Sequence, residues 1–330
     1  MIMKKMSEHL NEITRPSESV FSARPPLPEK LSLELNNTCN LNCEFCPFHS
    51  PHLPEHYKMK LSHMDPEMAK DILKRASELG IGRKELGLFA TGEILLYEGF
   101  GEIIGYAKEL GTFPYIYLTT NGVLADRDKI EEAVSAGVDS IRFSINAGNR
   151  EDYLKLHGKD RFDTVIENLK NTSGYLKSLG RNINLSVSCV VTKRTEAEKD
   201  NIRSLLSEYV DDIVFMNVGF LEDISSEVKK EYAVTGDEAE KVIGDEYICG
   251  YIFNTMFIDS NGIVRLCCSS GKALVPMADL NKDPDLERAW YDPVFCGFRE
   301  RLLTGRTKGT VCEKCIGRNI NKEMIQYWQR

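Results

Sequence analysis

The chain has 330 residues, of which 42% are apolar and 28% are charged, and its formal net charge is −8. This is the composition of a globular protein that is long enough to bury a large core and to form more than one domain. The acidic balance argues against a nucleic acid or an anionic membrane as partner. No apolar run is long enough to span a membrane, and the first residues lack the apolar segment of a signal peptide. We therefore expect a cytoplasmic protein.

The chain contains ten cysteines. Thiols stay reduced in the cytoplasm, so this number points to metal binding or catalysis rather than to disulfides. The cysteines gather near the two ends of the chain, which favours metal binding.

The predicted elements begin with a polar, proline-containing leader, residues 1–30, that has at most one short helix. From residue 31 strand and helix patterns alternate. Strands are expected at 31–36, 85–91, 115–120, 140–145, 184–191 and 212–218. Amphipathic helices are expected near 65–79, 99–110, 127–136, 162–178 and 196–208. Asp65 followed by Pro66 is typical of a helix start.

Six successive strand–helix units predict a parallel sheet with right-handed crossovers. The expected fold class is α/β, with a partial (β/α)6 barrel of the TIM type over residues 31–220. Functional residues of such barrels lie at the carboxyl ends of the strands.

Several predicted strands carry one polar face. The polar residues that alternate with apolar ones are Ser32, Glu34, Asn36, Arg142, Ser144, Asn184, Ser186 and Ser188. Such a face is unusual on a buried parallel strand, and it predicts a polar cavity inside the barrel, the alternative being a structural core that contains water. Tyr115 and Tyr117 share a face with Thr119 and line either this cavity or the core.

After residue 219 the pattern changes. Residues 221–245 are acidic and predict a linker with a helix, followed by a small domain over 246–330. Asp259-Ser260-Asn261-Gly262 separates the apolar runs 254–258 and 263–266, and Asn-Gly in this position is a strong hairpin signal.

The most informative motif is C-x3-C-x2-C at Cys39, Cys43 and Cys46, directly after the first strand. Three thiolates can hold a four-iron cluster and leave its fourth iron without a protein ligand, whereas a cluster that only transfers electrons usually has four protein ligands. The open iron can bind a substrate or cosubstrate. A structural metal knuckle or scattered core thiols are the alternatives.

The sequence CNLNCEFC from Cys39 resembles the cluster motif of the radical S-adenosylmethionine (SAM) superfamily, including the aromatic Phe45 before the last cysteine. The resemblance continues at the ends of later strands. Thr91-Gly92-Glu93 resembles the family's glycine–glutamate motif, with Thr91 in place of a glycine. Thr119-Thr120-Asn121-Gly122 and Ser144-Ile145-Asn146 resemble its third- and fourth-strand endings.

This resemblance implies a SAM cluster held by the three cysteines and a 5'-deoxyadenosyl radical that removes hydrogen from a substrate carbon. The implied SAM contacts are Phe45, Gly92, Glu93, Thr119, Asn121 and Ser144. Glu93 would accept hydrogen bonds from the SAM ammonium group, the alternative being a surface carboxylate. A flavodoxin or ferredoxin is the implied electron donor.

The C-terminal cysteines resemble the SPASM/Twitch extension of this superfamily. The implied ligands of an auxiliary [4Fe–4S] cluster are Cys249, Cys267, Cys312 and Cys315, with zinc as the alternative. No cysteine follows Cys315, so the resemblance is to the shorter Twitch form with one auxiliary cluster. The spacing is similar to that of the 2-deoxy-scyllo-inosamine dehydrogenases, which oxidise a ring alcohol of a small cyclitol.

Other residues are candidates without a fixed role. Arg142 could bind SAM or substrate, or stabilise an oxygen-centred charge. Cys268 and Cys296 could return a hydrogen atom to a substrate radical, whereas Cys189 fits the core. An anionic substrate group could be contacted by side chains of the loop after the cluster motif, namely His49, His52, His56, His63, Lys58 and Lys60.

The function predicted from these residues is oxidation of an alcohol to a carbonyl on a small sugar, cyclitol or nucleotide derivative, by an enzyme with two [4Fe–4S] clusters and SAM. Epimerisation of such a substrate and maturation of a ribosomal peptide are the alternatives. A non-catalytic zinc or redox protein is the alternative from another class.

Overall fold

The computed structural model describes residues 20–55, 58–180, 182–218, 226–232, 247–268, 275–312 and 320–321. Most of the expected leader and linker, His56 and Cys315 lie outside the described residues. The expected division into four segments at 30, 220 and 245 stays a prediction.

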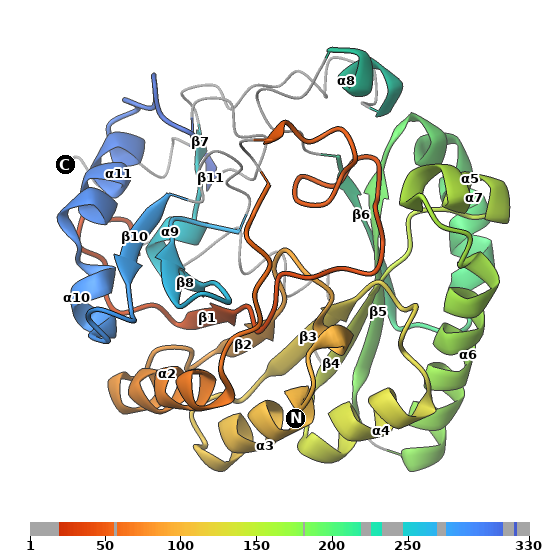
Figure 1. Ribbon diagram of the computed structural model, residues 1–330, viewed down its shortest axis with the longest axis horizontal. Coiled ribbons are helices and arrows are strands. Elements are labelled where there is room, and N and C mark those ends of the chain that lie inside the picture. The colour runs from red at the N-terminus through yellow and green to blue at the C-terminus, as the bar shows by residue number, and fades with distance from the viewer. Residues whose placement is uncertain are drawn as a thin grey trace.

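Figure 1 shows a curved sheet whose outer face is covered by helices. The strands are β1 (Lys30–Leu33), β2 (Glu85–Leu88), β3 (Ile116–Thr120), β4 (Ser140–Ser144), β5 (Asn184–Val191), β6 (Asp212–Asn217), β7 (Tyr247–Ile248), β8 (Thr255–Ile258), β9 (Ile263–Arg265), β10 (Pro276–Asp279) and β11 (Ile320–Asn321). The helices are α2 (Pro66–Leu79), the short 3-10 turn η3 (Ile94–Leu96), α3 (Phe100–Glu109), α4 (Arg127–Ala136), α5 (Arg150–His157), α6 (Phe162–Leu179), α7 (Lys193–Leu206), α8 (Ser226–Tyr232), α9 (Tyr251–Asn254), α10 (Leu286–Trp290) and α11 (Pro293–Leu303).

Strands β1 to β6 are parallel and lie side by side in chain order. This arrangement confirms the predicted α/β fold with a partial TIM-like barrel. The six strands and the five helices predicted between them are present, with ends that differ by up to three residues from the expected ranges. Helix α5 was not predicted, because only Tyr153, Leu156 and His157 of it are buried and its apolar periodicity is correspondingly weak.

The helix start predicted at Asp65 is confirmed. Its carboxylate accepts hydrogen bonds from the backbone N–H groups of Glu67 and Met68, and Pro66 occupies the first turn. Gly80 ends α2 in the left-handed conformation, at φ 69°, which a residue with a Cβ adopts only at a cost.

The same sheet also includes the C-terminal hairpin, which is formed by β8 and β9. The hairpin was predicted, but its pairing with the barrel strands was not. β8 pairs in parallel with β1, from Lys30 opposite Thr255 to Leu33 opposite Ile258. β8, β9 and β10 then pair in antiparallel fashion, so one nine-stranded sheet runs from β10 to β6. The predicted Asn-Gly hairpin is confirmed between β8 and β9, where Gly262 has φ 74°.

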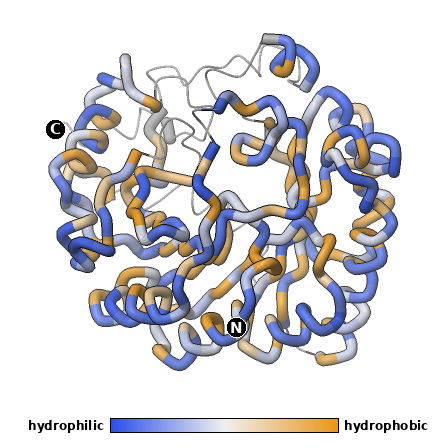
Figure 2. Tube along the Cα trace, in the orientation of Figure 1, coloured by the Kyte–Doolittle hydropathy of each residue, from blue (hydrophilic) through white to orange (hydrophobic). Residues whose placement is uncertain are grey.

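Alternate residues of β1 and its extension face opposite environments. Leu31, Leu33 and Leu35 are at most 1% exposed and belong to the core between sheet and helices. Ser32 and Glu34 line a pocket on the other side. Figure 2 shows the same division on a larger scale, with apolar residues along the strands and polar residues on the outward turns of the helices.

Among the described residues, no helix combines the length and the apolar character needed to cross a bilayer.

Candidate metal centre and adjoining pocket

The three N-terminal cysteines lie in residues 39–46, here called the cluster loop, which contains no helix or strand. Burial raises the pKa of each thiol, that of Cys39 to about 11 and that of Cys43 well above its usual range. The charge on Cys46 adds to the rise at both Cys39 and Cys43, so the three sulfurs lie close enough to repel one another as thiolates.

Helix α5 supports the cluster loop. The backbone N–H groups of Asn42 and Glu44 donate to the carbonyl oxygens of His157 and Leu156, over 3.4 and 2.9 Å. Those carbonyls belong to the last turn of α5, where a helix leaves such groups without an internal partner. Lys159 Nζ adds a 2.8 Å hydrogen bond to the carbonyl of Asn40.

Hydrogen-bond donors surround the sulfurs. The backbone N–H groups of Phe48 and His49 donate to Cys46 Sγ over 3.4 and 3.3 Å, and His157 Nδ1 lies 3.1 Å from Cys43 Sγ. In the part of the chain that the structure describes, no three His, Cys, Asp or Glu side chains are arranged as ligands of one metal ion. Buried thiols that repel one another and face N–H donors fit an iron–sulfur cluster, because iron binding displaces their protons and offsets the cost of burying thiolates.

The Gly92-Glu93 motif packs directly against the segment that enters the cluster loop. The Glu93 N–H donates to the Thr38 carbonyl over 2.8 Å. A Cβ on Gly92 would lie 2.5 Å from the Asn36 carbonyl oxygen and 2.7 Å from that of Thr38. Only glycine allows this close contact between two backbones.

The Glu93 carboxylate is buried, not on the surface. Oε1 accepts from Thr120 Oγ1 (2.6 Å) and the Leu95 N–H (3.1 Å), and Oε2 accepts from the Asn121 N–H (2.6 Å). Burial raises its pKa, and these hydrogen bonds oppose the rise. Glu93 therefore ties the end of β2 to the end of β3, and its contact with a SAM ammonium group stays a prediction.

The other predicted SAM contacts lie around the same strand ends. Asn121 donates from Nδ2 to Asn40 Oδ1 over 2.6 Å, which holds the cluster loop to the end of β3. Thr119 is partly buried on β3, and Ser144 Oγ lies 3.5 Å from Ser188 Oγ. Phe45 is buried, with its ring centroid 6.2 Å from that of His157.

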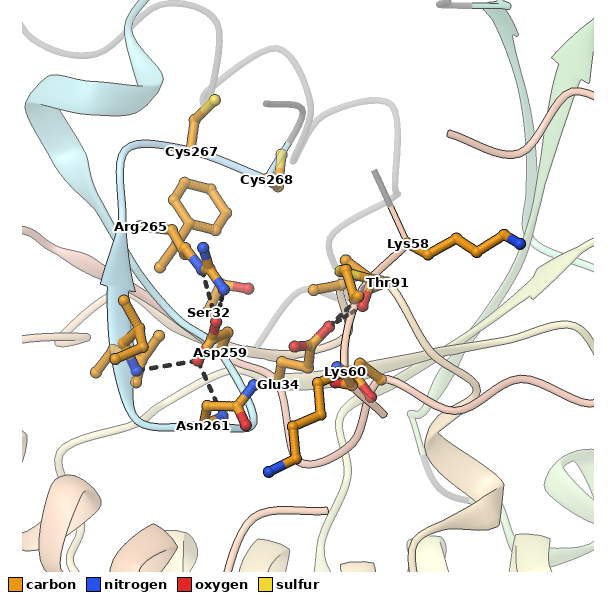
Figure 3. A pocket seen from close by; sticks show the side chains of 16 residues that line it. Ser32, Glu34, Lys58, Lys60, Thr91, Asp259, Asn261, Arg265, Cys267 and Cys268 are labelled. Atoms are coloured by element: carbon orange, nitrogen blue, oxygen red, sulfur yellow. Dashed lines mark hydrogen bonds and ion pairs between the residues drawn. The ribbon is translucent and has the colours of Figure 1, made fainter. Parts of the chain in front are cut away.

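A pocket of about 420 Å³ separates the carboxyl ends of β1 and β2 from the C-terminal hairpin. Figure 3 shows Glu34 between Thr91 on one side and the hairpin residues on the other, with Cys267 and Cys268 at the upper end. The lining also includes Lys58 and Lys60 from the segment after the cluster loop. Of the polar face predicted for the first strand, Ser32 and Glu34 line this pocket, whereas the Asn36 amide donates to Thr38 and to the Glu93 carbonyl.

The walls of the pocket are joined by buried carboxylates. Glu34 accepts from the Thr91 N–H and hydroxyl through Oε1, and from the Ser260 N–H and hydroxyl through Oε2. Asp259 fixes the hairpin turn by accepting from the N–H groups of Asn261 and Ile263, and it pairs with Arg265. The hairpin is therefore held to the barrel mouth at Ser260.

Arg142 lies in the middle of β4 and is 5% exposed. Its guanidinium carbon lies 4.0 Å from the centroid of the Tyr117 ring. In register, Arg142 stands between Thr119 and Ser186. Arg142 Nε and Nη2 and Ser186 Oγ are buried and have no hydrogen-bond partner among the described residues. Burying such polar atoms costs free energy unless a polar ligand or a water molecule forms hydrogen bonds with them.

Tyr117 connects Arg142 with the C-terminal segment. Burial raises the pKa of Tyr117 well above its usual range, charges on Glu85, Tyr251 and Cys268 raise it further, and Arg142 opposes the rise. The Tyr117 side chain thus lies within electrostatic reach of both Arg142 and the cysteine-rich segment.

The other cysteines of the described ranges lie in different environments. Cys267 and Cys268 line the pocket, and Cys249 and Cys312 are partly exposed. Cys296 lies on α11 with its Sγ 3.5 Å from the Tyr291 carbonyl, and it does not line the pocket. Cys189 is fully buried in the core.

His49, His52 and His63, which lie near the cluster loop, have protein partners. His49 Nε2 lies 3.0 Å from the Thr91 carbonyl, His52 pairs with Glu44, and His63 lies 3.0 Å from Thr38 Oγ1. Contact of these groups with a substrate stays a prediction.

His157 was not predicted as part of the site, and Glu34 was predicted only as a residue of the polar face of the first strand. The cap residue Asn149, with Asp152 three positions later and Gly158 at the end, could have indicated α5. The contact between His157 and Cys43 joins residues 114 positions apart and leaves no local signal.

We expect Gly92→Ala to destabilise the protein and to lower its iron content after anaerobic reconstitution. The added Cβ overlaps backbone atoms that cannot rotate away, so we expect a loss of about 1–3 kcal/mol in the free energy of unfolding. Denaturant unfolding and iron analysis measure the two effects.

Gly105→Ala is the matched control. Gly105 lies inside α3, and nothing lies within 4 Å of its added Cβ. This variant should keep its iron and gain up to about 1 kcal/mol. Equal behaviour of the two variants would contradict the steric argument for Gly92.

Two curated relatives are similar to part of the chain. The uncharacterised protein MJ0804 of Methanocaldococcus jannaschii is 30% identical over 185 residues, which cover 56% of this chain and 55% of that protein. A GTP 3',8-cyclase of Chlorobaculum tepidum is 27% identical over 137 residues, which cover 42% of this chain and 38% of that protein. The chain thus spans about half or less of the length of these relatives.

Three solved structures share the fold over most of the chain. SuiB of Streptococcus suis, bound to S-adenosylmethionine, has a TM-score of 0.64 at 17% identity and covers 89% of this chain and 73% of its own. BtrN in complex with AdoMet and 2-DOIA has a TM-score of 0.54 at 16% identity, with 87% and 92% covered. The enzyme anSMEcpe with bound AdoMet has a TM-score of 0.58 at 17% identity, with 87% and 88% covered.

Family models match both parts of the chain. The model of an iron–sulfur cluster-binding domain, SPASM, matches residues 249–316, which include all four C-terminal cysteines expected to bind a cluster. The model of the radical SAM superfamily matches residues 33–205, more than half of the chain. With the cysteine triad at the end of β1 and the glycine–glutamate motif at the end of β2, this protein belongs to the radical SAM superfamily, as an enzyme of the SPASM/Twitch group.

Proposed function

We propose that this radical SAM enzyme oxidises an alcohol carbon of a small hydroxylated molecule to a carbonyl. The observation that carries the proposal is the pocket that joins the barrel mouth to Cys267 and Cys268. A substrate in this pocket would lie between the strand ends that carry the SAM motifs and the cysteines of the second iron–sulfur centre. Its volume of about 420 Å³ suits a sugar, cyclitol or nucleotide derivative.

When bound, the SAM cluster and SAM supply a 5'-deoxyadenosyl radical that removes a hydrogen atom from the substrate carbon. In this chain, Cys39, Cys43 and Cys46 would hold that cluster. Gly92 allows the segment after β2 to pack closely against the backbone that enters the cluster loop. The buried Glu93 holds the ends of β2 and β3 together.

The oxidation removes one hydrogen atom, one proton and one electron from the substrate, so it needs an electron acceptor in addition to the 5'-deoxyadenosyl radical. The hydrogen atom lost from carbon forms a C–H bond of 5'-deoxyadenosine. The carbonyl forms when the substrate loses the hydroxyl proton to water and one electron. We propose that Cys249, Cys267, Cys312 and Cys315 hold an auxiliary [4Fe–4S] cluster that takes this electron, with a flavodoxin or ferredoxin supplying electrons to the SAM cluster.

We propose that Arg142, which lies on β4 and is not among the residues that line the pocket, binds the reacting oxygen of a substrate that extends from the pocket across the barrel mouth. Its buried guanidinium has two nitrogens without a hydrogen-bond partner among the described residues, and Ser186 lies opposite Arg142 on β5. A fixed cation stabilises negative charge that develops on oxygen as the hydroxyl proton leaves. Binding of the SAM carboxylate is the alternative role.

We expect each turnover to yield one 5'-deoxyadenosine and one product with a new carbonyl, two mass units lighter than the substrate. The assay uses reconstituted protein with SAM and dithionite and a panel of polyols, cyclitols and nucleosides, followed by mass spectrometry and carbonyl trapping. A product of unchanged mass contradicts oxidation.

We expect Arg142→Lys to lower kcat/KM for the substrate by about 10- to 100-fold, because a lost hydrogen bond to a charged group costs about 1.5–3 kcal/mol. SAM binding and substrate-independent cleavage of SAM should persist. Arg150→Lys, at an exposed pair with Asp160, is the control. Loss of SAM binding in Arg142→Lys would instead assign this residue to the SAM carboxylate.

We expect about eight irons per chain, because two [4Fe–4S] clusters are proposed. Cys267→Ala should reduce the content to about four and keep the cluster of the N-terminal triad. Cys189→Ala, which changes a thiol of the core, should keep the full content of about eight irons per chain. About four irons in the unaltered protein, or zinc bound by the C-terminal cysteines, would contradict the auxiliary cluster.

Epimerisation is the second candidate, and it is favoured by the position of Cys268 on the pocket wall. Its thiol could return a hydrogen atom to the substrate radical, leaving a sulfur radical that one electron from the flavodoxin or ferredoxin and one proton from water convert back to the thiol. Solvent deuterium at one carbon of a product of otherwise unchanged mass would identify this reaction, and Cys268→Ala would abolish it. For maturation of a ribosomal peptide, the third alternative, the test is binding of a precursor peptide encoded by a neighbouring gene.

A further inference from the structure

A chain of hydrogen bonds leads from β5 to a ligand of the SAM cluster. The backbone N–H of Val190 donates to Asn146 Oδ1 over 2.7 Å. Asn146 Nδ2 lies 3.5 Å from His157 Nε2, and His157 Nδ1 lies 3.1 Å from Cys43 Sγ. Asn146 and His157 are 4% and 1% exposed, so solvent does not compete for these contacts.

The first link sets the direction of the whole chain. A backbone N–H can only donate, so the atom of Asn146 that faces Val190 is its oxygen. Its amide NH2 then faces His157 Nε2, which must accept. A neutral imidazole that accepts at Nε2 carries its proton on Nδ1 and donates it to Cys43 Sγ.

Packing fixes the imidazole ring in this position. Tyr153 stacks on it, with ring centroids 4.2 Å apart, and Phe45 meets it edge to face at 6.2 Å. The carbonyl of His157 also accepts the Asn42 N–H, so the residue is attached to the cluster loop at its backbone as well.

We propose that His157 is a positioning residue that raises the reduction potential of the SAM cluster by donating an N–H···S hydrogen bond to Cys43. Each electron added to a cluster increases the negative charge on its sulfurs, so a donor stabilises the reduced state more than the oxidised one. Nothing in this inference depends on the substrate or the reaction, and it can fail while the proposed oxidation holds.

The test is an EPR-monitored redox titration of the reconstituted enzyme, following the cluster signal that changes when SAM is added. His157→Phe keeps a ring for Tyr153 to stack on but removes the donor, and we expect a lower potential and slower reduction by flavodoxin. His157→Asn places an amide N–H near the position of Nδ1 and should restore the potential toward that of the unaltered protein.

Tyr153→Phe is the matched control. The Tyr153 hydroxyl is buried beside His157 without a hydrogen-bond partner in the described ranges, so its removal alters the same packing but no contact to sulfur. The potential should stay unchanged. An unaltered potential in His157→Phe at full iron content, or an equal shift in Tyr153→Phe, overturns the proposal.

A measurement without a variant covers the case in which His157→Phe fails to fold. Enzyme labelled with ring-15N histidine should show a 15N hyperfine coupling to the reduced SAM cluster in pulsed EPR. The ring of His49 contacts the Thr91 carbonyl rather than a sulfur, so His157 is the expected source. Absence of the coupling contradicts the hydrogen bond.

Discussion

The hydrogen bonds between the cluster loop and the last turn of α5 are the contacts on which the metal centre depends. A segment without helix or strand has no repeating hydrogen bonds of its own, and ordering it costs conformational entropy. The last turn of a helix has carbonyl groups that lack hydrogen-bond partners within the helix. Asn42 and Glu44 supply donors to two of these carbonyls, so each element satisfies the other. The spacing of three buried sulfurs is thereby set by backbone contacts.

Two buried carboxylates fix further segments at the mouth of the barrel by hydrogen bonds. Burying a carboxylate is unfavourable unless donors surround it, and both Glu34 and Glu93 receive donors from segments distant in sequence. Glu93 joins two neighbouring strand ends, and Glu34 joins the barrel to the hairpin. Their hydrogen bonds hold these segments together beyond the ends of β1 and β2.

The elements that follow from local patterns were predictable. The cap of α2, the Asn-Gly hairpin and the exact bounds of β5 arise from a few adjacent residues. Strands β1 and β2 end about three residues earlier than their alternating patterns. The residues beyond those ends include Glu34 and Thr91, and Thr91 donates from its backbone N–H and its hydroxyl to the Glu34 carboxylate.

Contacts between distant segments were not predictable from one sequence. Neither the pairing of β8 with β1 nor the contact of His157 with Cys43 has a signature in nearby residues, because each depends on how the whole sheet closes. The cysteine triad and the glycine–glutamate motif could be recognised because the chemistry of the cofactors restricts which residues can stand there. The substrate leaves no comparable restriction on a short motif.

The pairing of β8 with β1 has a consequence for electron tunnelling, whose rate falls steeply with distance. β1 leads into the N-terminal cysteine triad, and the β8–β9 hairpin leads to Cys267. The triad and Cys267 are therefore attached to one shared hydrogen-bond ladder. The distance between them stays constant as long as the pairing of β8 with β1 is kept, and a loss of that pairing would slow any electron transfer from one to the other.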